Sequence, residues 1–297
     1  MIQKKKKRRR DSDTLFAYLM LAPDIIGLAI FIFLPILIAF YISLNDWNAL
    51  EPMKFVGFKN YEIMMSDKTW WASLTKTFTY TLFFVPIVFV ISLLLAVFLH
   101  SITNKLQQFF RTSYFIPYAI STVVAAVIWR FMMDERRGFL NAVITAVGLP
   151  AQRFLGDPKI ALFCIAIISS WLLIGYYTII FLAAIKDISP SYYEAAKLDG
   201  ANFVQTFRFI TFPMLREVST FVLIVTTIAS FQVFDLVKIL TKGGPAQATN
   251  VSVFYIYTNA FDFMKLGYAS ALAVVLFLII LTLSLIQLKV TGGEGHA

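Results

Sequence analysis

The sequence contains few charged residues. Only 14% of its 297 residues are Asp, Glu, Lys or Arg, whereas 59% are hydrophobic. Soluble domains usually carry about 25% charged and about 45–50% apolar residues. This composition excludes an ordinary water-soluble domain and predicts a chain that is solvated largely by lipid.

Cysteine and histidine are nearly absent as well. Cys164 is the single cysteine and lies inside an apolar run, so no intramolecular disulfide can form and the residue is best interpreted as a small buried hydrophobe. The two histidines, His100 and His296, have no cluster of ligand residues around them. We therefore expect no metal site.

Motifs for chemistry are also missing. The sequence has no G-x-x-x-x-G-K-[ST] phosphate loop, so we do not expect the chain to bind ATP itself. No Ser/His/Asp set or paired carboxylates indicate a reaction on a substrate. We expect no catalytic residue and no cofactor in this chain.

The net charge of +9 comes largely from one place. Seven of the 26 basic residues form the run Lys4–Arg10, directly before the first apolar segment. A basic segment beside a membrane span is typical of a cytoplasmic anchor to anionic lipid headgroups. This location favours membrane lipid over nucleic acid as the partner of the positive charge.

Six apolar runs are each long enough to cross a bilayer, which needs about 20 residues. They are apolar on all sides, which is typical of membrane spans rather than surface helices. Their approximate ranges are residues 15–44, 78–99, 114–133, 160–185, 218–239 and 268–288. The sequence thus predicts an all-α, polytopic membrane helical bundle with about six transmembrane helices.

The basic tail predicts a cytoplasmic N-terminus, which places residues 101–112, 186–217 and the C-terminus inside. The other connections hold more basic residues than these inner loops do, so the loops alone would not set this orientation. We give the tail precedence because the charge bias acts most strongly beside the first span. The expected organisation is a cytoplasmic tail at 1–14, a transmembrane domain at 15–288 and a second cytoplasmic tail at 289–297.

Asp24 is the one acidic residue well inside the first run. Acids within a membrane are functional candidates by default. The run is long enough for Asp24 to lie near the cytoplasmic headgroups, and we favour that interpretation.

The loop between the fourth and fifth spans has the pattern of two short helices with a sharp bend. Pro190 suits a first helical turn, and Ser191 with Glu194 fits a capping box. Gly200 can adopt the left-handed conformation that ends a helix. Pro213 is expected to break the second helix before the fifth span begins.

This loop carries a family resemblance. Its Glu-Ala-Ala triplet, glycine, isoleucine and proline resemble the "EAA" loop of binding-protein-dependent ABC importer permeases. The residues that carry this resemblance are Glu194, Ala195, Ala196, Gly200, Ile210 and Pro213, and Phe212 departs from the leucine usual before the proline. The resemblance implies a cytoplasmic coupling helix that docks on a separate ATPase, with Asp199 in the same segment.

Further stretches resemble the carbohydrate-uptake branch of these permeases, of the maltose or multiple-sugar type. They are Phe55–Tyr61, Arg111 with Pro117, Leu240–Pro245 with Thr249, and Gly267–Ala271. The glycine-rich stretch is also a plain turn signal. Together with the loop, the resemblance covers nearly the whole chain.

Sugars present hydroxyl groups and flat apolar faces, so a path for them needs polar side chains beside aromatic rings. The fourth and fifth spans supply such residues, and positions counted from the family motifs give a candidate substrate path. Counting gives Ser169, Tyr176, Thr226 and Ser230, and Gln232 is added as a polar residue of the fifth span; Trp171, Tyr177 and Asp235 lie in the same spans. Ser and Thr are also ordinary packing residues between membrane helices.

The resemblance implies the permease subunit of an ATP-driven importer for a sugar or oligosaccharide in a bacterial plasma (inner) membrane. Implied partners are a second, related permease chain in a heterodimer, two cytoplasmic ATPase subunits that bind ATP and Mg, and an extracytoplasmic sugar-binding protein. Two alternatives remain, an ABC importer for another polar solute and an ion-coupled secondary transporter. A membrane-embedded enzyme is disfavoured by the missing catalytic set.

Overall fold

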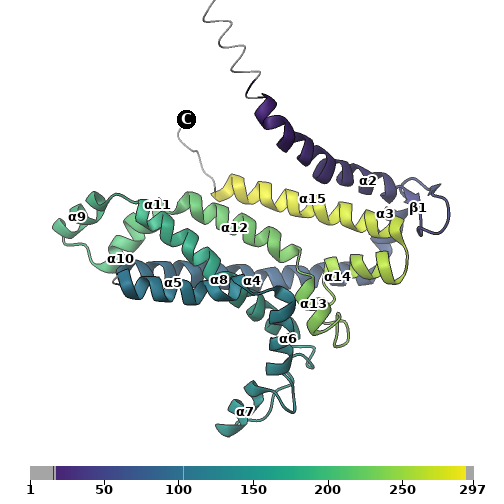
Figure 1. Ribbon diagram of the computed structural model, residues 1–297. Coiled ribbons are helices and arrows are strands. Elements are labelled where there is room, and N and C mark those ends of the chain that lie inside the picture. The colour runs from purple at the N-terminus through teal and green to yellow at the C-terminus, as the bar shows by residue number, and fades with distance from the viewer. Residues whose placement is uncertain (1–15, 17, 103, 292–297) are drawn as a thin grey trace, which may run out of the picture. The chain divides into compact units, whose positions relative to one another are not determined.

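Helices account for most of the residues that the structure describes, as Figure 1 shows. The computed structural model describes residue 16, residues 18–102 and residues 104–291. The predictions for the tail at 1–14 and for residues 292–297 lie outside the described residues. The chain divides into two units, one made of residues 1–66 and 259–275 and the other of residues 67–258 and 276–297.

The first unit contains the helix Tyr18–Ser43, which includes the π-helical segment η1 (Ala29–Phe33) and α2 (Leu34–Ser43). A two-residue ribbon follows, in which β1 (Asn45–Asp46) pairs antiparallel with β2 (Lys54–Phe55). The unit also holds α3 (Lys59–Ser66), most of η3 (Thr258–Asp262) and the first part of α15 (Leu266–Thr291).

Two stretches that carry the carbohydrate-branch resemblance meet in this unit. The side-chain amide of Asn60 donates to the carbonyls of Ser43 and Asn45, at 2.8 Å and 2.9 Å. The amide of Gly267 donates to the Trp47 carbonyl at 3.2 Å, and a side chain at Gly267 would overlap the carbonyl of Asn45. The Phe55–Tyr61 and Gly267–Ala271 stretches thus both brace the end of the first span.

The second unit is a bundle built around two long helices. Its first elements are α4 (Lys68–Ser101), α5 (Asn104–Ala119), α6 (Thr122–Met132), α7 (Phe139–Ala146) and α8 (Ala161–Asp187). Then follow α9 (Pro190–Leu198), α10 (Phe203–Thr206), the π segment η2 (Phe207–Thr211), α11 (Phe212–Met214), α12 (Arg216–Phe231), α13 (Asp235–Leu240), α14 (Ser252–Tyr257) and the end of α15. With 34 residues, α4 is about 51 Å long at 1.5 Å per residue, longer than a bilayer core.

The core of the second unit forms where α4 packs along α8. Phe89 and Phe181 meet edge to face with ring centroids 5.5 Å apart. The hydroxyl of Ser92 donates to the carbonyl of Ile174 at 3.0 Å, a polar tie of the kind that joins membrane helices. Gly175 lets α5 approach α8 closely, because an added Cβ would overlap the backbone of Tyr114.

The structure confirms the helical membrane fold. Among the described residues, five helices are long and apolar enough to span a membrane, and a bent pair brings the number to six. The five are Tyr18–Ser43, Lys68–Ser101, Ala161–Asp187, Arg216–Leu240 and Leu266–Thr291. They match five of the predicted runs, although most extend beyond the predicted bounds.

The third span departs from the expectation of one helix over 114–133. It consists of α5 and α6, which are bent by 95° relative to each other. Most of the expected loop at 101–112 is helical, because α5 begins at Asn104. The fifth span is also divided, between α12 and α13.

The segments predicted to lie inside the cell gather at one end of the second unit (Figure 1). The ammonium group of Lys186, at the end of α8, donates to the side-chain oxygen of Gln107 on α5 at 2.7 Å. The guanidinium of Arg216, at the start of α12, donates to the carbonyl of Thr291 at 3.0 Å. Because these segments lie at the same end, the structure agrees with the predicted alternation of inner and outer connections. That this end faces the cytoplasm remains a prediction.

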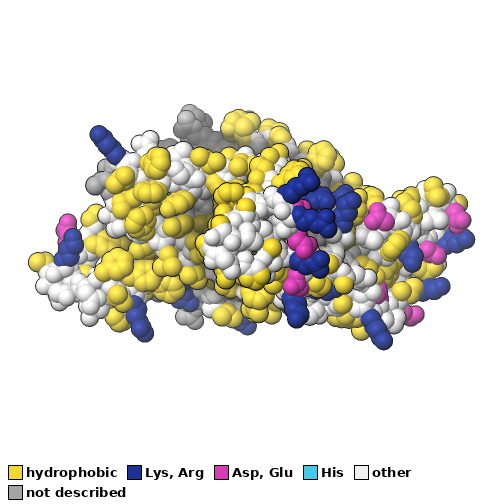
Figure 2. Space-filling view, turned by 90° about the horizontal axis from the view of Figure 1, so that it is seen from below, with side chains coloured by type: hydrophobic (Ala, Val, Ile, Leu, Met, Phe, Trp, Pro, Cys, Tyr) yellow, Lys and Arg dark blue, Asp and Glu magenta, His cyan; other side chains and the backbone are white. Residues whose placement is uncertain are grey.

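Much of the helix surface is apolar. Figure 2 shows hydrophobic side chains over a large part of the visible face, with Lys and Arg gathered beside Asp and Glu in a smaller region. Exposed residues of α4 include Leu82, Val90 and Leu94. Such a surface suits contact with lipid or with another membrane chain.

Candidate functional site

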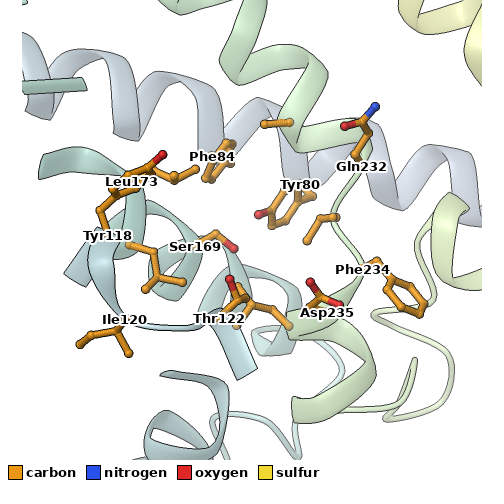
Figure 3. A pocket seen from close by; sticks show the side chains of 14 residues that line it. Tyr80, Phe84, Tyr118, Ile120, Thr122, Ser169, Leu173, Gln232, Phe234 and Asp235 are labelled. Carbon is orange, nitrogen blue, oxygen red and sulfur yellow. The ribbon is translucent and has the colours of Figure 1, made fainter. Parts of the chain in front are cut away.

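A cavity of about 230 Å³ lies where the two divided spans face α4 and α8 in the second unit. The α5–α6 break, α8 and the α12–α13 break all border it, as Figure 3 shows. Its lining consists of Tyr80, Phe84, Tyr118, Ile120, Thr122, Ser169, Leu172, Leu173, Ala229, Gln232, Val233, Phe234, Asp235 and Leu236.

The helix breaks that open the cavity have local causes. Pro117 lies near the end of α5, and the amide of Ile120 closes a turn onto its carbonyl at 3.2 Å. Ser121 is extended and precedes α6 as its N-cap residue. At the other break, Gln232 ends α12 and Asp235 stands in the first turn of α13, where an acid suits the helix dipole.

Hydroxyl and carboxylate oxygens converge in the cavity. Figure 3 shows the side-chain oxygens of Tyr80, Thr122, Ser169 and Asp235 directed into the same space between the helices. The hydroxyl of Ser169 donates to the carbonyl of Ile165 at 2.9 Å, and both Ser169 and Tyr80 line the cavity. The arrangement combines hydrogen-bonding groups with aromatic rings, which is typical of a site for a polar small molecule.

The structure brings two of the five candidate path residues to this cavity. Ser169 and Gln232 line it, although the amide of Gln232 points away from the converging oxygens in Figure 3. Tyr176 lies behind the lining and stacks on Tyr118, with ring centroids 4.6 Å apart. It therefore supports a wall of the cavity.

Thr226 and Ser230 lie away from the lining. Both are fully buried, and the Thr226 hydroxyl donates to the carbonyl of Val222 at 2.6 Å. Ser230 donates to the carbonyl of Thr227 at 2.7 Å and bonds to the hydroxyl of Thr81 on α4 at 2.8 Å. In this structure these two side chains pack helices together.

Several lining residues were missed because they come from the second and third spans. Tyr80 and Phe84 are four residues apart on α4, a spacing that places them on one helix face, and their rings stack at 5.4 Å. Tyr118 and Thr122 flank the α5–α6 break. Polar and aromatic residues at mid-span were a usable signal, but only tertiary contacts bring them to Ser169.

The second candidate site is the loop from Ile188 to Leu215. Here α9 ends as the sequence predicted, because Gly200 adopts φ +75°. The amide of Ala201 donates to the carbonyl of Ala196 at 2.9 Å, and that of Gly200 to the carbonyl of Lys197 at 3.2 Å. This is the Schellman pattern that a glycine at this position permits.

The predicted capping box at Ser191 and Glu194 is wrong. The N-cap residue is Ser189, because Pro190 occupies the first helical position, and Ser189 makes no side-chain cap bond. Its hydroxyl instead bonds to that of Ser191 at 2.8 Å. A capping box does form at α10, between Asn202 and Gln205.

The expected break at Pro213 is displaced. The proline lies within α11, directly after η2, and the chain leaves the helix at Leu215 before α12 begins. A π segment is an irregularity of helical bonding that often occurs at functional sites. The structure thus separates α11 from α12 two residues later than the sequence predicted.

Ala195 and Ala196 do not share one environment. Ala195 is exposed, as are Glu194 and Asp199, whereas Ala196 is buried against the rest of the chain. Leu198 is 89% exposed and Phe203 69% exposed. The outward surface of α9 and α10 therefore combines charged residues with large apolar side chains.

Contacts fix this loop to the bundle. The hydroxyls of Tyr193 and Thr211 lie 3.3 Å apart and join α9 to η2. The ring of Tyr193 also lies 6.1 Å from that of His100, at the end of α4. These contacts join α9 to η2 and to the end of α4.

Among the described residues, no group of three or more His, Cys, Asp or Glu side chains is placed to hold a metal ion.

A family model described as a binding-protein-dependent transport system inner membrane component matches residues 55–290. The chain is 35% identical to the probable ABC transporter permease protein YurN of Bacillus subtilis, over 96% of this chain and 99% of that protein. It is 32% identical to the arabinooligosaccharides transport system permease protein AraP of the same organism, over 94% and 90% of the two chains.

A solved structure shares the fold. It belongs to a bacterial ABC transporter involved in the import of the acidic polysaccharide alginate. The TM-score is 0.81 with 24% sequence identity, and the match covers 97% of this chain and 98% of the other.

Proposed function

Because the chain belongs to the family of binding-protein-dependent transport system inner membrane components, we propose that it is the permease subunit of an ATP-driven importer for a sugar or oligosaccharide. The name of its relative AraP, a permease for arabinooligosaccharides, supports the substrate class. The sequence stretches that resemble the carbohydrate-uptake branch also support a sugar as the substrate.

The cavity between the divided spans is the proposed sugar path. Tyr80, Thr122 and Ser169 offer hydroxyl groups, and the rings of Phe84 and Tyr118 offer flat apolar faces. A pyranose presents the complementary surfaces, with hydroxyls at its edge and C–H groups on its faces. This match is the observation that carries the proposal. Tyr176 would hold Tyr118 in place, and Thr226 and Ser230 would shape the path through helix packing.

The α9–α10 surface is the proposed docking site for a cytoplasmic ATPase. It presents Glu194 beside Ala195, Leu198 and Phe203, and it is joined to η2 and α4 through Tyr193. The α9–α10 segment lies in the chain between α8 and α12. Its movement would shift these two helices relative to each other and so change the shape of the cavity that they border. ATP and Mg would be bound by two such ATPase subunits.

We also propose the remaining partners. A second, related permease chain would complete the pathway as a heterodimer, and an extracytoplasmic binding protein would deliver the sugar. The chain would cross a bacterial plasma (inner) membrane several times, with its N-terminus and α9 on the cytoplasmic side.

Reconstitution tests this proposal. The complete importer would be placed in proteoliposomes with ATP inside, its binding protein outside, and a panel of radiolabelled arabino- and malto-oligosaccharides. Uptake that requires both ATP and the binding protein supports the proposal. Uptake that follows an ion gradient without ATP would identify an ion-coupled carrier, and ATP-driven uptake of a non-sugar solute alone would correct the substrate class.

A further inference from the structure

The cavity has one ionisable carboxylate and no basic side chain in its lining. Among the residues that the structure describes around it, Asp235 is the only Asp or Glu, and no Lys or Arg takes part. The other polar groups are neutral hydroxyls and the amide of Gln232. The cavity of this chain is therefore negative.

The nearest lysine in sequence does not neutralise this charge. The ammonium group of Lys238, one turn further along α13, donates to the hydroxyl of Tyr257 at 2.8 Å. It also lies 4.1 Å from the centroid of the Tyr257 ring and 5.4 Å from that of Phe234. These contacts hold Lys238 over the rings of Tyr257 and Phe234, and among the described residues it forms no ion pair with Asp235.

Asp235 lies in a cavity whose other walls are neutral and largely apolar. It stands exposed at the α12–α13 break, and the lining that it shares also contains the apolar residues Phe84, Leu172 and Leu236. A cleft with one sign of charge and apolar walls focuses the field on a solute that enters it. Figure 3 shows the carboxylate directed into the space that it shares with Thr122 and Ser169.

We propose that Asp235 makes the cavity a charge filter, which admits neutral and cationic saccharides and disfavours saccharides that carry carboxylate or sulfate groups. This inference rests on the proposed sugar-importer function and adds the charge class of the substrate. The fold does not decide that class, because a transporter of the same fold imports an acidic polysaccharide.

A thiol reporter in the cavity measures this field directly. Thr122→Cys in a Cys164→Ser background, within the complete importer, would be modified by cationic trimethylammonium-ethyl methanethiosulfonate and by its anionic sulfonatoethyl counterpart. The ratio of the two rates, normalised to a free thiol, is expected to favour the cation by about tenfold because of the nearby carboxylate.

Substitution of Asp235 identifies the source of the preference. Asp235→Asn is expected to bring the normalised ratio close to one, whereas Asp235→Glu is expected to keep it. Glu217→Gln removes the same charge from the far end of α12 and is expected to leave the ratio unchanged. An unchanged rate with neutral methyl methanethiosulfonate shows that the cavity is intact. The proposal is overturned if the Thr122→Cys importer that keeps Asp235 shows no cation preference. It is also overturned if the preference persists in Asp235→Asn.

Saccharide protection links the field to the substrate. Maltotriose is expected to slow modification of the reporter by the neutral reagent, and trigalacturonate to do so only in Asp235→Asn. Equal protection by maltotriose and trigalacturonate in the Thr122→Cys importer that keeps Asp235 overturns the charge filter. If neither saccharide protects while the cation preference persists, the sugar function fails and the charge assignment stands.

Discussion

Lys186 and Gln107 are joined by a hydrogen bond of 2.7 Å between the ammonium group and the side-chain oxygen. The amide of the same Gln107 side chain donates to the carbonyl of Leu99 at 2.6 Å. One buried side chain thus connects the ends of α4 and α8 to the start of α5, and the end of α8 directly precedes the loop from Ile188 to Leu215.

Gln107→Leu is expected to destabilise this junction. The substitution removes a buried amide that is bonded to both Leu99 and Lys186, and it leaves the Leu99 carbonyl unsatisfied, which typically costs about 1–3 kcal/mol. Thermal unfolding of the purified importer should show a lower midpoint, and transport per ATP hydrolysed should fall. Gln108→Leu makes the same change at an exposed neighbour on α5. Equal effects of the two substitutions would contradict a specific role for Gln107.

Gly175→Ala is expected to separate α5 from α8. The new methyl group would overlap the backbone of Tyr114, which cannot move as a flexible side chain would. Forcing extra volume into packed helices costs about 1–3 kcal/mol, so the melting midpoint should fall. Gly156→Ala adds the same methyl group with neighbours at 3.7 Å, an ordinary contact distance. A similar melting midpoint in both variants would show that the α5–α8 contact is unimportant for stability.

The parts of the fold that the sequence predicted are those with local causes. The spans follow from apolar run length, and the positive φ of Gly200 follows from a residue that adopts it without strain. The capping box failed because both Ser189 and Ser191 are good N-cap residues. Pro190, which suits the first helical position, makes Ser189 the N-cap.

The rest depended on contacts between distant segments. The break between α12 and α13 contains neither glycine nor proline, so no local breaker indicates it. Tyr80 and Thr122 reach Ser169 only because α4 and α6 pack around α8. The exposed Leu198 and Phe203 mark a surface, but which protein covers it cannot be predicted from their spacing.

Gly200→Val is expected to impair coupling through strain alone. A Cβ at Gly200 would meet no atom within 4 Å, so sterically the site is open. The left-handed conformation nevertheless costs a residue with a Cβ about 1–2 kcal/mol, which would distort the end of α9. Measured side by side, ATP hydrolysis is expected to continue while sugar uptake falls. Gly200→Asn, which tolerates this conformation better, should retain most coupling. Normal coupling in Gly200→Val would remove the glycine from the mechanism.

Cysteine labelling should place α9 and the α6–α7 segment on opposite sides of the membrane. Lys197 and Arg136 are both exposed. In a Cys164→Ser background, a membrane-impermeant maleimide added to intact cells lacking an outer-membrane barrier should label Arg136→Cys but not Lys197→Cys. In inside-out vesicles the pattern should reverse. The opposite result would overturn the orientation assigned from the basic N-terminal tail.

Glu194→Lys is expected to weaken retention of the ATPase while the permease remains folded in the membrane. Glu194 is the fifth residue of α9 and makes no cap, so the helix dipole contributes little there. Its carboxylate is exposed beside Ala195 and near Leu198, on the proposed docking surface. Charge reversal at a docked interface costs up to several kcal/mol through like-charge contact.

Co-purification of tagged permease with its ATPase measures this loss. Glu51→Lys reverses an exposed acid between β1 and β2 and changes the net charge by the same amount, so it should leave retention intact. Glu194→Gln should give an intermediate result, because it removes the carboxylate charge without reversing it. Full retention in Glu194→Lys together with normal uptake would place the docking contacts elsewhere in the loop. Equal loss in Glu51→Lys would show that net charge, rather than the α9 surface, controls assembly.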